Sequence, residues 1–167
     1  LNGRYIGYAT DSFTPSELDL TDALVPGENR LAAQVFKWTS GSWLEDQDFY
    51  RFSGIFRDVV LYRRPSAHVE DIHITTDLTE DYSSAEIVAR INLVGEGAIL
   101  ARIEGVGELA PDADGAYSIR VEQPRLWSHE DPALYELSIG VRDAAGQLVG
   151  VIGQRVGVRR LAIEDGV

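Results

Sequence analysis

Residues 68–75, His-Val-Glu-Asp-Ile-His-Ile-Thr, alternate between apolar and polar side chains. In an extended strand this alternation places Ile72 and Ile74 on one face and Asp71 and His73 on the other. The stretch therefore predicts a half-buried β-strand. Similar runs rich in Val, Ile, Leu and Tyr follow it, at residues 85–93, 99–103, 116–121, 134–141 and 149–156.

Turn sequences rich in Gly and Asp separate these runs, at residues 95–97, 112–115 and 143–146. Glycine supplies the positive φ that tight hairpin turns need, and Asp accepts hydrogen bonds from the backbone of its own turn. About seven short strands in roughly 100 residues are typical of an immunoglobulin-like β-sandwich. We therefore expect one complete module of this kind after Pro65.

The first 64 residues are also expected to be β-structure, with only four or five strands, which are too few to close a two-sheet sandwich. Residues 30–38 carry apolar side chains on both faces, which indicates a strand buried between two layers. Pro26 and Gly27 predict a turn before it. Residues 16–24 are interpreted as an extended segment with one turn at Asp22.

Composition and charge exclude several classes of partner and chemistry. The 167 residues carry a formal charge of −12, and most of it belongs to the second module, with −2 in residues 1–64 and −10 in residues 65–167. An acidic surface argues against a nucleic-acid partner. No apolar run reaches the roughly 18 residues of a membrane span, so no membrane partner is expected. With no cysteine, the chain has no disulfide, thiolate metal site or cysteine nucleophile.

The absence of Met and a first residue inside an apolar run lead us to expect a piece of a longer protein. Any catalytic residues of that longer protein are then expected to lie outside these 167 residues.

The segment at residues 41–59 is the richest in chemically useful side chains. It combines five aromatic residues with the carboxylates Glu45, Asp46 and Asp48. Aromatic rings that pack on the C–H face of a pyranose, beside charged acceptors for its hydroxyls, suit a sugar site. Carboxylate oxygens also suit a hard cation. A surface loop whose acids pair with Arg51 and Arg57 remains the alternative.

Catalysis within this segment is not expected. A glycosidase needs two carboxyl groups on opposite sides of its substrate, and Asp46 and Asp48 point the same way from an extended strand. The three histidines have no metal-ligand spacing, and Trp127 is interpreted as a core anchor at a sandwich edge.

Several segments resemble glycoside hydrolase family 2, and specifically its bacterial lactose-type β-galactosidases. The run Glu-Asp-Gln-Asp at residues 45–48 favours the galactosidases over the family's glucuronidases and mannosidases. Residues 1–64 resemble the later part of the jelly-roll sugar-binding domain of that family. Residues 65–161 resemble its immunoglobulin-like second domain, and residues 162–167 the start of a linker to a catalytic barrel that this chain lacks. The motifs that carry the resemblance lie at residues 1–12, 17–21, 27–32, 43–48, 51–59, 124–127 and 132–135.

The resemblance implies a role for Asp48. Its position matches a residue that contacts galactose and a Na⁺ ion in the active site of such enzymes, so Asp48 is the expected substrate and metal residue. Tyr50 stands where relatives often carry Trp. No catalytic residue is expected in this chain, because the acid/base and nucleophile glutamates of the family lie in its barrel. The supporting residues are expected to be Glu45, Asp46, Trp43, Tyr50 and Arg51.

The resemblance further implies a cytoplasmic parent enzyme, a β-galactoside substrate, and Na⁺ and Mg²⁺ in the parent, with no cofactor held by this chain alone. The rest of the parent chain is then the main partner. Alone, residues 1–64 are expected to be partly disordered, or to form a non-native dimer through exposed sheet edges. An autonomous carbohydrate-binding or structural β-sandwich module remains the alternative function.

Overall fold

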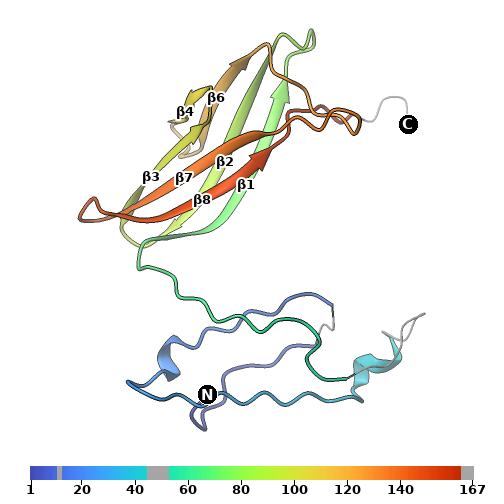
Figure 1. The fold of residues 1–167 in the computed structure, drawn as a ribbon, viewed down its shortest axis with the longest axis vertical. Coiled ribbons are helices and arrows are strands. Elements are labelled where there is room, and N and C mark those ends of the chain that lie inside the picture. Colours follow the sequence, from blue (N-terminus) through green and yellow to red (C-terminus); the bar gives the residue numbers. More distant parts are fainter. Residues whose placement is uncertain (11–12, 45–52, 163–167) are drawn as a thin grey trace. The chain divides into compact units, whose positions relative to one another are not determined.

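The computed structural model describes residues 1–10, 13–44 and 53–162 (Figure 1). The chain forms two compact units, residues 1–61 and residues 62–167. The second unit is a sandwich of two antiparallel sheets, and the predicted all-β fold class is confirmed.

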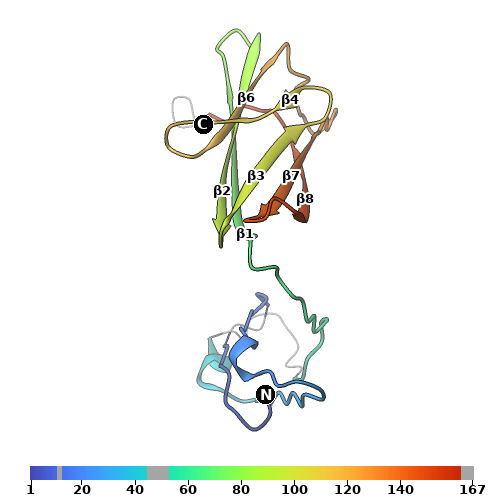
Figure 2. The same ribbon diagram turned by 90° about the vertical axis from the view of Figure 1, so that its left-hand side faces the viewer.

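One sheet has the strand order β1-β2-β6-β5 and the other the order β4-β3-β7-β8. Figure 2 shows the two sheets as separate layers that face each other. Each long strand predicted after Pro65 is present, with its ends moved by a few residues. The strands are β1 His68–Leu78, β2 Ser84–Val94, β3 Gly97–Ile103, β4 Gly107–Glu108, β5 Ala110–Pro111, β6 Tyr117–Glu122, β7 Tyr135–Asp143 and β8 Leu148–Val156.

The core lies between the sheets and is built by alternation along the strands. In β2 the buried residues Ala85, Ile87 and Ala89 alternate with Glu86 and Arg90, which are exposed. The facing sheet contributes buried residues in the same way. The largest fully buried apolar side chains are Ile87, Ile103, Leu137, Ile139, Val141 and Val158.

The first unit differs from the second in its secondary structure. Its described residues form no strand, and its helical elements there are two short 3₁₀ turns, η1 Thr21–Ala23 and η2 Ser40–Trp43. The first of these confirms the turn expected at Asp22. Gly27 has a φ of +91°, which agrees with the turn predicted at Pro26 and Gly27.

The buried strand predicted at residues 30–38 is wrong. These residues form no strand, with a bend at residues 37 and 38, and the large side chains Leu31, Phe36 and Trp38 are more than half exposed. Apolar residues on both faces make a strand only where two layers are present to cover them. Among the described residues of this unit no second layer covers residues 30–38.

Candidate functional site

The sugar site predicted from the sequence falls in a part of the chain that the structure does not describe. Asp48 and the supporting residues Glu45, Asp46, Tyr50 and Arg51 all lie outside the described residues. The backbone of Trp43 is described and ends the 3₁₀ turn η2. The role predicted for Asp48 therefore stays a prediction.

Both described flanks of the 45–52 segment are held by hydrogen bonds. On the N-terminal side, the Thr39 backbone N–H donates to Ser42 Oγ at 2.9 Å, and the Ser42 N–H donates to the Thr39 carbonyl at 3.1 Å. On the C-terminal side, Arg57 Nη1 donates to the Phe13 carbonyl at 3.0 Å. The alternative in which Arg57 pairs with the acids at residues 45–48 involves residues outside the described ones.

Asn2 and Asn29, which are 27 residues apart, organise the described part of the first unit. Asn2 Nδ2 donates to Asn29 Oδ1 at 2.8 Å and to the Ala23 carbonyl at 3.0 Å. The Arg30 N–H donates to Asn2 Oδ1 at 2.8 Å, and Asn29 Oδ1 also accepts from the Val25 N–H at 2.9 Å.

Sequence reasoning did not predict this pairing. The dipeptide Asn2-Gly3, with φ values of 53° and 79°, is a turn signal that could have drawn attention to it. The pairing fixes where residues 1–4 lie relative to residues 23–30 inside this unit.

The histidines do not form a metal site. His68 Nδ1 lies 2.8 Å from the Pro65 carbonyl and its Nε2 lies 3.4 Å from Glu70. His73 and His129 are exposed. Within residues 1–10, 13–44 and 53–162, no three His, Asp or Glu side chains are grouped so that they could hold a metal ion. No helix in the same residues is long and apolar enough to cross a membrane.

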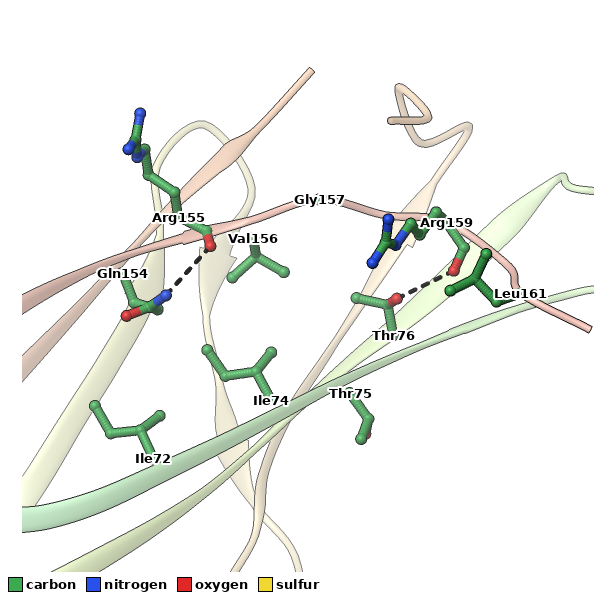
Figure 3. Close-up of a pocket in the computed structure, with 10 residues that line it drawn as sticks. All are labelled: Ile72, Ile74, Thr75, Thr76, Gln154, Arg155, Val156, Gly157, Arg159 and Leu161. Carbon is green, nitrogen blue, oxygen red and sulfur yellow. Dashed lines mark hydrogen bonds between the residues drawn. The ribbon is translucent and has the colours of Figure 1, made fainter. Parts of the chain in front are cut away.

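The second unit has a groove of about 600 Å³ between β1 and the end of β8 with the segment that follows it (Figure 3). A glycosidase site needs two carboxyl groups, and this groove is lined by none. Its lining residues are Ile72, Ile74, Thr75, Thr76, Gln154, Arg155, Val156, Gly157, Arg159 and Leu161.

A smaller neighbouring hollow of about 320 Å³ contains the carboxyls of Asp77 and Glu80 beside Arg159 and Arg160. Two acids beside two arginines balance in charge, which suits a surface ion-pair cluster better than a pair of catalytic acids. Neither hollow therefore offers glycosidase chemistry.

Comparison with known protein families agrees with the division of the chain into two units. Residues 1–65 match the family model described as the glycosyl hydrolases family 2 sugar binding domain, and residues 67–159 match the model described as glycosyl hydrolases family 2. The chain belongs to glycoside hydrolase family 2. The boundary between the two matches lies close to the boundary between the two compact units.

Individual relatives in glycoside hydrolase family 2 are similar over the whole chain. A β-galactosidase of Clostridium acetobutylicum is 43% identical over 99% of this chain, and one of Halalkalibacterium halodurans is 41% identical over 100% of it. The chain spans only 20% and 18% of the length of these relatives. The structure of β-glucuronidase 3 of Bacteroides uniformis is similar with a TM-score of 0.58 and 27% identity, covering 71% of this chain and 15% of that one.

Trp127, in the family 2 unit at residues 67–159, is neither in the buried hydrophobic cluster nor among the side chains packed against it, so the core anchor predicted there is not confirmed. It is half-buried, and it forms an isolated antiparallel bridge with Pro132. The side of Trp127 that faces the end of β8 makes further contacts, which are described below.

Proposed function

We propose that this chain is a non-catalytic part of a cytoplasmic, retaining β-galactosidase that hydrolyses terminal β-D-galactosides. The observation that carries the proposal is the pair of relatives named β-galactosidase, which are 43% and 41% identical over essentially the whole chain. The hydrolytic chemistry would then belong to the four-fifths of such an enzyme that this chain does not span.

The separation of roles follows from the chemistry of retaining hydrolysis. Such an enzyme places two carboxyl groups about 5–5.5 Å apart, one as nucleophile and one as acid and base, on either side of the scissile bond. Asp46 and Asp48, two positions apart in an extended run, would point the same way and could not flank a sugar. These residues therefore suit binding and not bond cleavage.

Within this proposal the Asp48 carboxylate contacts galactose and contributes an oxygen ligand to a Na⁺ ion. A carboxylate suits both tasks, because it accepts strong hydrogen bonds from hydroxyl groups and is a hard ligand for a hard cation. Trp43, Tyr50 and Arg51 would support the loop together with Glu45 and Asp46. The Mg²⁺ expected in the parent enzyme would be held outside this chain.

The direct test places these 167 residues in a whole enzyme. They would replace the matching segment of the Clostridium acetobutylicum relative, and the chimera would be assayed with a chromogenic β-galactoside. Loss of a charge-assisted hydrogen bond of about 1.5–3 kcal/mol predicts that Asp48→Asn lowers kcat/KM by roughly 10- to 100-fold. The activation of the chimera by Na⁺ over K⁺ should be lost in the same variant.

Asp58→Asn is the matched control, because it removes an exposed carboxyl of the same segment that is not among the supporting residues of the proposed site. We expect it to change kcat/KM by less than about threefold. An Asp48→Asn chimera that keeps its kcat/KM and its response to Na⁺ would overturn the role proposed for Asp48.

The alternative, an autonomous carbohydrate-binding module, predicts a different result with the chain alone. Calorimetry with galactose and lactose would then show binding at millimolar concentration or below that Asp48→Ala abolishes. We expect no measurable binding and no hydrolysis by the chain alone, because one loop without its companion walls cannot offset the entropy of ordering a sugar.

A further inference from the structure

The segment that follows β8 is held to the rest of the sandwich by residues distant in sequence. Val158 is fully buried, and its carbonyl accepts a hydrogen bond of 2.8 Å from the Trp127 backbone N–H. Trp127 is itself bridged to Pro132. The chain thus leaves β8 along the 124–135 loop, with its backbone bonded to that loop.

Gly157 lies against the base of the Trp127 side chain. A Cβ atom built on Gly157 would lie 3.0–3.1 Å from Cβ, Cγ and Cδ1 of Trp127. These atoms are next to the Trp127 backbone, which is fixed at both the bridge and the hydrogen bond, so they have little freedom to move away. Gly157→Ala would therefore require the tryptophan side chain to move by a few tenths of an ångström.

Arg159 also contacts the Trp127 ring. Its guanidinium carbon lies 4.8 Å from the centroid of the Trp127 ring, within the range of a cation–π interaction. Its carbonyl accepts a hydrogen bond of 3.4 Å from Thr76 Oγ1 of β1 (Figure 3). β1 and β8 are edge strands of different sheets. The hydrogen bond from Thr76 of β1 to Arg159, which follows β8, therefore links the two sheets.

We propose that Trp127, Gly157 and Arg159 form a clamp that fixes the path of the chain as it leaves the immunoglobulin-like sandwich. The three are positioning residues: in the whole enzyme the clamp keeps this sandwich in register with the catalytic part. This positioning role rests on the function proposed above, whereas the clamp itself rests only on the contacts just described.

Positioning of this kind has a large effect on rate, because a displacement of about 1 Å at a reacting centre can cost roughly 100-fold. A loosely attached exit segment would allow such displacements. Backbone bonds at Val158 and Arg159 and the stacked ring together remove that freedom.

The clamp can be tested on the chain by limited trypsin digestion, since Arg159 and Arg160 are cleavage sites within the exit segment. Gly157→Ala should force the segment off Trp127 and raise the rate of cleavage after these two arginines about tenfold, measured by mass spectrometry of the released peptides. Gly153→Ala is the matched control, because Gly153 lies in β8 with no atom within 4 Å of an added Cβ. It should leave that rate unchanged.

Three further variants keep the test decisive if Gly157→Ala unfolds the whole sandwich and exposes every site. Arg159→Lys keeps a trypsin site but loses the planar group above the ring, and should raise local cleavage about threefold. Trp127→Phe keeps an aromatic face and should raise it less than Trp127→Ala. Equal cleavage after residues 159 and 160 in Arg159→Lys, Trp127→Ala and the unchanged chain would overturn the clamp.

The positioning role is tested in the chimeric enzyme. We expect Gly157→Ala to lower kcat about tenfold with KM changed less than twofold, and Gly153→Ala to change neither. In a Trp127→Ala background, Gly157→Ala should add no further loss, because the two residues act through one contact. Faster local cleavage with unchanged kcat would overturn the positioning role and leave the clamp. An unmodified chimera without activity would instead contradict the proposed function.

Discussion

Asp81 is a charged residue whose hydrogen bonds support a turn of the sandwich. It lies in the turn between β1 and β2, where its Oδ1 accepts from Ser83 Oγ at 2.8 Å and from the Ser83 N–H at 3.1 Å. The Thr79 hydroxyl, followed by the Ser83 hydroxyl and N–H, lowers the pKa of Asp81 from 3.8 to about 2. These hydrogen bonds favour the charged carboxylate, and they support a turn in which Tyr82 has a φ of +59°.

The lowered pKa of Asp81 predicts a specific dependence of stability on pH. A carboxyl whose pKa is lower in the folded state stabilises the fold above its unfolded value of about 3.8, and that contribution is lost as the pH falls through about 2. Asp81→Asn should therefore lower the thermal unfolding midpoint at pH 7, and the difference from the unchanged chain should shrink between pH 4 and pH 2. Glu80→Gln, in the neighbouring exposed carboxyl, is the control. A difference that stays constant down to pH 2 would contradict this account.

At the scale of elements, the hairpin between β2 and β3 depends on the absence of a side chain. Gly95 has a φ of +83°, and a Cβ placed on it would lie 2.1 Å from the Ser66 carbonyl oxygen. Gly146, in the turn between β7 and β8, has a similar φ of +79° but no atom within 4 Å of an added Cβ. The two positions share the same backbone requirement and differ only in the space around them.

The comparison gives a prediction for the two turns. Gly146→Ala should cost about 1 kcal/mol of unfolding free energy, because an L-residue is strained at positive φ. Gly95→Ala should cost about 1–3 kcal/mol more, because the backbone near Ser66 must also move. Denaturant unfolding of both variants measures the difference. Equal losses of unfolding free energy in the two variants would show that the backbone near Ser66 moves aside without destabilising the fold.

The same elements show what sequence could predict. Alternation such as that of Ile72 and Ile74 predicts strands directly, because period two survives wherever one face is buried. Strands of two residues, such as β4 and β5, carry no periodicity and were not predicted. The contact of Trp127 with Arg159 joins residues 32 positions apart, and no local pattern indicates it. Most of the candidate sugar site, including Asp48, lies outside the described residues, so its prediction rests on the family resemblance.

At the scale of the whole molecule, the two units differ in how they bury apolar surface. Every residue of the main hydrophobic cluster lies between Ala85 and Val158, within the second unit. In the first unit, large apolar side chains are exposed, among them Leu31, Phe36, Val59, Val60 and Leu61. Exposed apolar surface of this extent favours association with another chain or with another part of the same chain.

This difference predicts that the sandwich folds without the first unit. A chain shortened to residues 62–162 keeps the whole cluster and both sheets, so its thermal midpoint should match that of the sandwich transition in the full chain. The full chain should self-associate as its concentration rises, while the shortened chain stays monomeric, because only the full chain carries the exposed side chains at residues 31–38 and 55–61. Light scattering at increasing concentration measures both. A full chain that stays monomeric at every concentration, and resists proteases evenly along its length, would show that the first unit buries its own apolar side chains.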